Sequence, residues 1–251
     1  MKTIGIIGGL GPMATVYFLE CITRMTAAER DQEHPRVFLE SLPDIPDRTD
    51  YILGKSPDNP LPRMIEAGKS LEKMGADFIT MPCVTAHYFY DALSRELHIP
   101  LIPLTRVLAE EICEKGIRRV GILATTGTIE SKAIEKELEA QGISSVIPRG
   151  ELQGLLMEII YGQIKKDAPV QWDVVERVID DLRGQGAEKI ILGCTELPLL
   201  KKSVWQAENE ALSQMLFGGC IDVLEVLAQK AVLESGAVLK ERYRDVIGSL
   251  F

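Results

Sequence analysis

Residues 75–87, GADFITMPCVTAH, and residues 186–198, GAEKIILGCTELP, share one pattern. Each stretch begins with Gly-Ala and an acidic residue, continues as an apolar run, and reaches a cysteine, Cys83 or Cys194, at the same distance from its first glycine. A short apolar run between turn residues is typical of a buried strand. Each cysteine is therefore expected at the carboxyl end of a strand, where open α/β sheets bind ligands, and near a helix start, which favours a thiolate.

Strands alternate with helices along the rest of the chain, which predicts an α/β fold with mainly parallel sheets. Because the cysteine unit occurs twice, we expect two pseudo-symmetric α/β domains with the active site in the cleft between them. The first domain is predicted to comprise residues 1–102 together with about 211–251, and the second residues 103–210. On this interpretation, a closing strand at 216–221 and the helix after it return to the first domain.

The composition excludes several classes of function. The chain has 251 residues, of which 46% are hydrophobic, and a formal net charge of −9. This charge gives no basic footprint for nucleic acid. No stretch is long enough to span a bilayer, and the N-terminus lacks the pattern of a cleaved signal peptide, so a cytoplasmic protein is expected.

The five cysteines form an odd set without CxxC spacing. A disulfide framework and a structural zinc site are both poorly supported by this pattern, so reduced thiols are expected. The chain also contains neither a complete dinucleotide motif nor a recognisable metal cluster. We therefore predict an enzyme that needs no cofactor.

Two thiols at matched strand ends could form a redox dithiol, a metal pair, one nucleophile with a bystander, or an acid–base pair. Redox pairs usually have CxxC spacing, and a metal would require more histidines than the three present. A Cys83 nucleophile with His87 as its base would leave Cys194 unexplained. An acid–base pair accounts for the duplication, because one thiolate removes a proton from one face of a carbon while the other thiol protonates the opposite face.

Two further regions carry candidate binding groups. The turn GGLGP at 8–12 does not complete a dinucleotide motif; it is either a simple strand-to-helix turn or, at Gly11, a backbone floor for a small ligand. Arg48 lies in an acidic loop. Its guanidinium could hold a carboxylate by two hydrogen bonds or could pair with a neighbouring aspartate.

Six motifs occur along nearly the whole chain: IIGGLGP at 6–12, DQEHP at 31–35, IPDRT at 45–49, MPC with TAH at 81–87, LATTGT at 123–128 and GCTE at 193–196. Together they resemble the aspartate/glutamate racemase family, and within it the aspartate racemases most of all. The resemblance implies a cofactor-independent racemase that acts on a small acidic amino acid and forms a homodimer.

The same resemblance implies roles for individual residues. Cys83 and Cys194 would be the two proton donors and acceptors. Arg48 and Lys165 would position the acidic substrate, and Thr85 and Thr195 would contact it through a hydroxyl or a backbone N–H. Sequence alone favours a solvated lysine at the end of a helix for Lys165.

The chain departs from the family pattern Pro-Cys-Asn-Thr-Ala-His, because Val84 stands at the asparagine position. Val84 can neither donate nor accept a hydrogen bond, which predicts an altered substrate or a poor aspartate racemase. Three functions therefore stay open: an aspartate or glutamate racemase, a related isomerase or decarboxylase of dicarboxylic acids, and a non-enzymatic binding protein for small ligands.

Overall fold

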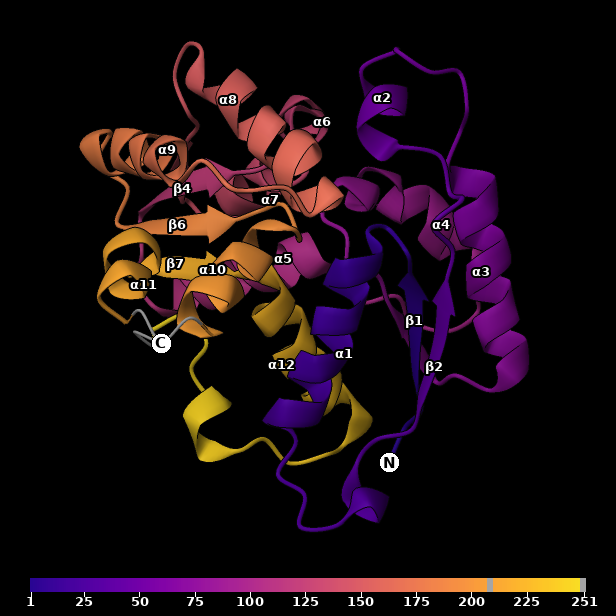
Figure 1. Cartoon of the computed structure of the whole chain (residues 1–251). Helices are drawn as coiled ribbons and strands as arrows, with labels where there is room; N and C mark the ends of the chain where they lie inside the picture. The colour runs from indigo at the N-terminus through magenta and orange to yellow at the C-terminus, as the bar shows by residue number, and fades with distance from the viewer. Residues whose placement is uncertain (207–209, 249–251) are drawn as a thin grey trace.

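The computed structural model describes residues 1–206 and 210–248, and it contains two parallel sheets (Figure 1). The first sheet has the strand order β2-β1-β3 and the second the order β5-β4-β6-β7. Their bounds are β1 Ile4–Gly8, β2 Val37–Ser41, β3 Phe78–Thr80, β4 Arg119–Leu123, β5 Ser144–Val146, β6 Lys189–Leu192 and β7 Cys220–Asp222. The predicted α/β class with mainly parallel sheets is confirmed.

Helices cover both sheets, as a parallel sheet requires. Around the first sheet lie α1 Pro12–Met25, α2 Arg48–Ile52, α3 Leu61–Met74 and α4 Tyr90–Glu96. The second half contains α5 Leu104–Glu114, α6 Thr126–Ser131, α7 Glu135–Ala140, α8 Leu152–Glu158, α9 Trp172–Gly184, α10 Leu197–Gln206 and α11 Glu210–Phe217, and α12 Val223–Ser235 follows β7. No helix of the described residues is both long and apolar enough to cross a membrane.

The buried strands explain why the apolar runs were recognisable. All five residues of β1 are buried, because helices cover both faces of a parallel sheet and select a continuous apolar run. The helix α9 instead buries one stripe, formed by Val174, Val175, Val178, Ile179 and Leu182. This spacing places the stripe on one side of a helix of 3.6 residues per turn.

The closing strand corrects the sequence interpretation. β7 pairs in parallel with β6, so it belongs to the second sheet and does not return to the first. The helix after it lies at the centre of the molecule, where α12 packs against both α1 and α5 (Figure 1). The segment after α12 also joins the first half, through a bridge between Thr26 and Leu239.

Carboxyl ends of strands from both sheets point toward one region. The segments that follow β1, β2 and β3 meet those that follow β4 and β6, and α2 of the first half contacts α6 of the second. A Cβ atom on Gly127 in α6 would lie 2.8 Å from Thr49 Cα in α2. Glycine at this position therefore allows the two halves to approach closely.

Candidate active site

One cleft between the two halves contains nearly all the residues that the sequence singled out. Its lining includes Arg48, Cys83, Val84, Thr85, Lys165, Cys194 and Thr195. The eighth candidate, Gly11, lies beside it: a Cβ at this position would be 2.6 Å from Glu196 Oε1 and 3.5 Å from Lys165 Nζ. Six other lining residues were not among the candidates, namely Leu10, Asp47, Thr49, Thr125, Tyr161 and Glu196.

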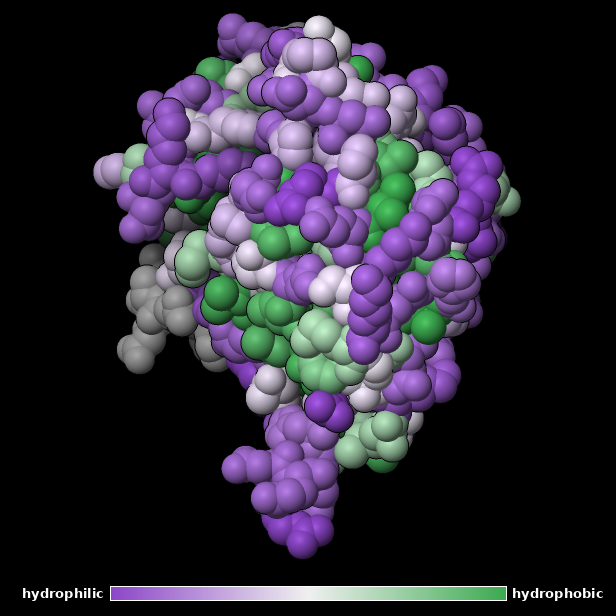
Figure 2. All heavy atoms as spheres, turned by 90° about the vertical axis from the view of Figure 1, so that its right-hand side faces the viewer, coloured by the Kyte–Doolittle hydropathy of each residue, from purple (hydrophilic) through white to green (hydrophobic). Residues whose placement is uncertain are grey.

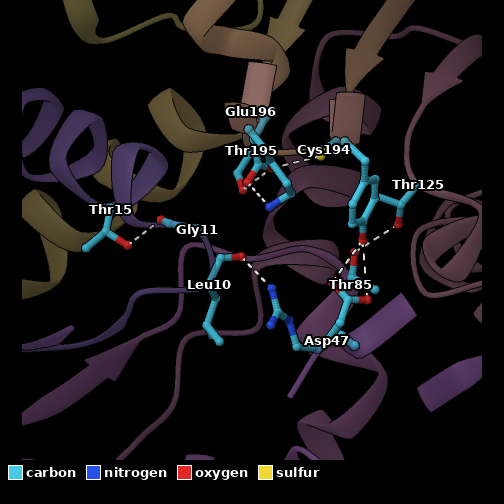
Figure 3. Close-up of polar contacts among 12 residues, drawn as sticks. Leu10, Gly11, Thr15, Asp47, Thr85, Thr125, Cys194, Thr195 and Glu196 are labelled. Carbon is cyan, nitrogen blue, oxygen red and sulfur yellow. Dashed lines mark hydrogen bonds and ion pairs between the residues drawn. The ribbon is translucent and has the colours of Figure 1, made fainter. Parts of the chain in front are cut away.

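Cys194 follows β6 and is buried together with Thr195 and Glu196 (Figure 3). Its thiol donates a hydrogen bond of 2.9 Å to Glu196 Oε2. Burial raises the pKa of Cys194 well above its usual value, and the charge of Glu196 raises it further. Cys194 is therefore held as a thiol whose hydrogen points at a carboxylate.

Lys165 completes this arrangement from the other side of Glu196. Its Nζ lies 2.5 Å from Glu196 Oε1. Burial disfavours the charge of Lys165, but the Glu196 carboxylate outweighs this effect and raises the pKa of the lysine. The ammonium also acts on the sulfur atoms of both Cys194 and Cys83, so it lies where either thiolate would be stabilised.

A distorted helix explains how Lys165 reaches the cleft. After α8 the chain forms a π-helical turn, Ile159–Gln163, and then a short 3-10 turn, Ile164–Lys166. The π turn has more residues than an α turn and is common at functional sites. It lets Tyr161 and Lys165 both line the cleft, and the Lys165 Nζ lies 5.5 Å from the centre of the Tyr161 ring.

Cys83 follows β3 and is oriented by His87. The Cys83 carbonyl lies 2.9 Å from His87 Nδ1, and the Leu104 N–H donates to His87 Nε2 at 3.2 Å. Burial lowers the pKa of this histidine, so it is neutral, with its proton on Nδ1. His87 therefore fixes the backbone around Cys83, and both of its ring nitrogens already have backbone partners.

Arg48 is the buried cation beside Cys83. Its guanidinium donates to the carbonyls of Leu10, at 2.9 Å, of Pro46, at 3.1 Å, and of Ile45, at 3.3 Å. Although burial disfavours its charge, the nearby Cys83 and Asp47 raise the pKa of Arg48. Its Nε is buried and has no hydrogen-bond partner within residues 1–206 and 210–248.

Hydroxyl groups connect the two halves across the cleft. Thr85 Oγ1 lies 3.1 Å from Thr125 Oγ1 and 2.8 Å from Thr128 Oγ1 (Figure 3). Thr125 also caps α6 by accepting a hydrogen bond from the Thr128 N–H. On the opposite wall, the Tyr161 hydroxyl donates to Asp47 Oδ2 at 3.1 Å.

Val84 lies between the cleft and the apolar core. It lines the cleft, but only 2% of its surface is exposed, and it packs within the large apolar cluster between the two halves. The resemblance implies that the family asparagine, at the position of Val84, serves the substrate carboxylate. Because the surroundings of Val84 are largely apolar, a polar side chain at this position would have to reach the cleft to find a partner.

The architecture is that of an α/β enzyme with its site at the carboxyl ends of parallel strands. A family model described as Asp/Glu/Hydantoin racemase matches residues 7–230, and the chain belongs to this family. Its named relatives are racemases, so the protein is an isomerase. The part of the chain that the structure describes has no group of three or more His, Cys, Asp or Glu suited to a metal ion.

Individual relatives agree with the family assignment. The broad specificity amino-acid racemase RacX of Bacillus subtilis is 29% identical over 77% of this chain and 85% of its own length. The structure of Picrophilus torridus aspartate racemase superposes with a TM-score of 0.82 at 31% identity, covering 97% of this chain and 98% of that one. An aspartate racemase homologue from Pyrococcus horikoshii gives a TM-score of 0.72 at 27% identity, covering 94% and 100%.

Proposed function

We propose that this protein racemises an acidic amino acid, aspartate or glutamate, by moving the α-proton between Cys83 and Cys194 without pyridoxal phosphate. The observation that carries this proposal is that both thiols line one cleft, each at the carboxyl end of a parallel strand from a different sheet. Two thiols that approach a carbon from opposite sides invert it. General acid–base catalysis requires such groups within hydrogen-bond reach of the proton that they transfer.

The two thiols have different surroundings, which suits them to complementary roles. Cys194 is a thiol that donates to Glu196, while Cys83 lies beside the Arg48 guanidinium. In one direction the Cys83 thiolate removes the α-proton, and the carbanion then takes the proton of the Cys194 thiol on its other face. Cys83 ends as a thiol and Cys194 as a thiolate, which the Lys165 ammonium stabilises. The reverse direction exchanges these roles.

The charges of the cleft suit an acidic amino acid. Arg48 has an unpartnered buried Nε–H that can donate to a substrate carboxylate, and Lys165 offers a second cation. The Asp47 carboxylate can receive the α-ammonium. Thr85 and Thr195 supply hydroxyls on the walls that carry Cys83 and Cys194.

Substrate entry requires the two halves to move apart. The cavity has a volume of about 10 Å³, which is close to the space that one water molecule needs. The contacts that must part are the hydrogen bond between Tyr161 and Asp47 and the hydroxyl cluster of Thr85, Thr125 and Thr128. Closure around the substrate would then exclude water from the carbanion.

A broader substrate range is the second candidate. The apolar wall at Val84 favours it, and a relative that is 29% identical is named a broad specificity racemase. Both candidates are tested by incubating the protein with a panel of single enantiomers in deuterated water and measuring α-deuterium and chirality. Inversion of aspartate or glutamate supports the first proposal. Inversion restricted to apolar or basic amino acids contradicts it, and binding without exchange contradicts racemisation altogether.

A further inference from the structure

We infer that Gly127 is a positioning residue, which sets how closely the two halves approach and so keeps the thiols of Cys83 and Cys194 away from bulk water. The contact involved joins α6 of the second half to α2 of the first. Its kinetic consequence rests on the proposed function, whereas its effect on the thiols can be measured without any racemase activity.

Gly127 does not need the conformational freedom of glycine. It is the second residue of α6, Thr126–Ser131. Nine other glycines among the described residues adopt a positive φ, and Gly127 does not. Alanine favours a helix more than glycine does, so the helix alone would gain from a methyl group at this position. The reason for glycine therefore lies in what surrounds it.

The space beside Gly127 is occupied by the backbone of the other half. A Cβ atom there would lie 2.8 Å from Thr49 Cα, 2.9 Å from Thr49 Oγ1 and 3.1 Å from Thr49 Cβ. Carbon atoms in contact normally lie about 3.5–4.0 Å apart. A Cβ on Gly11 would meet the end of the Glu196 side chain, which can turn aside, but a Cα atom cannot. A methyl group at position 127 would therefore push α2 and α6 apart.

Both partners of this contact are linked to the catalytic cleft. Thr49 directly follows Arg48, and both residues line the cleft. On the other side, Thr128 directly follows Gly127, and its Oγ1 lies 2.8 Å from Thr85 Oγ1. Separation of α2 from α6 would therefore widen the cleft beside Arg48 and draw Thr128 away from Thr85.

The two halves are closed around the thiols. Cys83 and Cys194 are 4% and 5% exposed, and the cavity that they line has a volume of about 10 Å³. The face of the first half, seen from the side of α2 and α3, is likewise closely packed with side chains (Figure 2). A reagent larger than water can therefore reach either thiol only when the halves separate.

Alkylation of individual cysteines measures this separation. Iodoacetamide is added to the native protein, and the rate at each cysteine is followed by peptide mass spectrometry. Both Cys83 and Cys194 should react about tenfold faster or more in Gly127→Ala, because overpacking destabilises the closed state by about that factor. Cys21 is equally buried, but it lies in α1 outside the cleft lining. It should react as slowly as in the wild type.

Gly154→Ala is the matched control. Gly154 is also a glycine in a short helix of the second half, α8, but a Cβ atom there would meet nothing within 4 Å. The alkylation rates of this variant should equal those of the wild type at all three cysteines. Wild-type rates at Cys83 and Cys194 in Gly127→Ala would overturn the inference. Equal acceleration at Cys21 would also overturn it, because Gly127 would then be required for folding and not for closure.

Racemisation in deuterated water measures the catalytic consequence. In a closed cleft, the Cys83 thiol that has taken the α-proton can return only that proton, while Cys194 delivers a deuteron to the other face. In Gly127→Ala, water can exchange the hydrogen of this thiol for deuterium before it is returned. At low conversion, the recovered starting enantiomer should therefore contain more deuterium than with the wild type, and kcat should fall.

The two experiments separate this inference from the proposed function. If the wild type racemises and Gly127→Ala gives the same kcat and the same deuterium content, the role of Gly127 is refuted. If the wild type does not racemise, the proposed function is refuted, and the alkylation rates of Cys83 and Cys194 still decide whether Gly127 controls closure.

Discussion

Replacing Glu196 by glutamine would test whether this carboxylate orients the Cys194 thiol and holds Lys165 in place. Glu196 accepts from Cys194 Sγ at 2.9 Å and from Lys165 Nζ at 2.5 Å. Glutamine keeps the size of the side chain, but its amide cannot take up a proton, and its NH₂ group must face one of the two donors. Cys194 would then lose its acceptor, or Lys165 would lose its partner.

The expected loss follows from these contacts. Losing a hydrogen bond to a charged group costs about 1.5–3 kcal/mol, which is about ten- to a hundredfold in rate. We therefore expect kcat of Glu196→Gln to fall by about ten- to a hundredfold. Glu196→Asp, which keeps a carboxylate, should retain more activity.

The pH dependence gives an independent measurement. Burial is the main reason why the pKa of Cys194 is raised, and the charge of Glu196 adds to it. Without that charge the Cys194 thiol ionises at a lower pH. In the reaction direction in which the Cys194 thiol donates the proton, kcat falls at high pH as this thiol ionises. This fall should therefore begin at a lower pH in Glu196→Gln. Wild-type kcat with an unmoved alkaline limb, in a variant that melts like the wild type, would refute the reasoning.

Three further predictions concern Arg48, Val84 and Glu225. Arg48→Lys should lower the free energy of unfolding by about 1–3 kcal/mol, because one ammonium nitrogen cannot take the places of the two guanidinium nitrogens that bind the three carbonyls. It should also raise KM, and denaturation and kinetics that both match the wild type would contradict this. Val84→Asn should raise kcat/KM for aspartate about tenfold or more through a hydrogen bond to a carboxylate. It should also lower Tm, because it places an amide in an apolar cluster. An unchanged kcat/KM would show that Val84 does not limit the activity on aspartate. Burial, and then the charge of Asp222, raises the pKa of Glu225 to about 7. This folded-state pKa exceeds the unfolded value of about 4.3, so the free energy of unfolding should decline as pH rises through about 7. Glu225→Gln should remove roughly 2 kcal/mol of the decline between pH 5 and 8, measured by urea titration. A decline that is unaltered in the variant would contradict this prediction.

The elements that hold the two cysteines were predictable because their signals are local. An apolar run that follows a Gly-Ala-acid turn and precedes a helix start places Cys83 and Cys194 without knowledge of the rest of the chain. The duplication then brings them together, since equivalent strand ends of two similar units can face one another. The partner of β7 had no such local signal: a short strand at 220–222 can pair with either sheet, and only long-range packing selects β6.

Physical reasons also explain why the sequence interpretation did not identify some residues of the site. Glu196 was visible in the GCTE motif, and a carboxylate two residues after a reactive cysteine was a usable signal that the sequence interpretation did not use. Tyr161 and Lys165 depend on a π-helical turn, which changes the side of the helix that faces the cleft and has no recognised sequence pattern. The three carbonyl partners of Arg48 come from the fold of its own loop and from Leu10, so they could not be read from spacing.

The central claim, that two thiols act from opposite faces of one carbon, is tested most directly by exchange of the α-proton in deuterated water. The measurement compares Cys83→Ser and Cys194→Ser with each pure enantiomer of aspartate or glutamate. A serine hydroxyl is too weak an acid to replace a thiol at this step. We predict that both variants fail to racemise and that each retains exchange with only one enantiomer, the opposite one in the two variants. Racemisation at the wild-type rate in either variant, or exchange of the same enantiomer in both, would contradict the account.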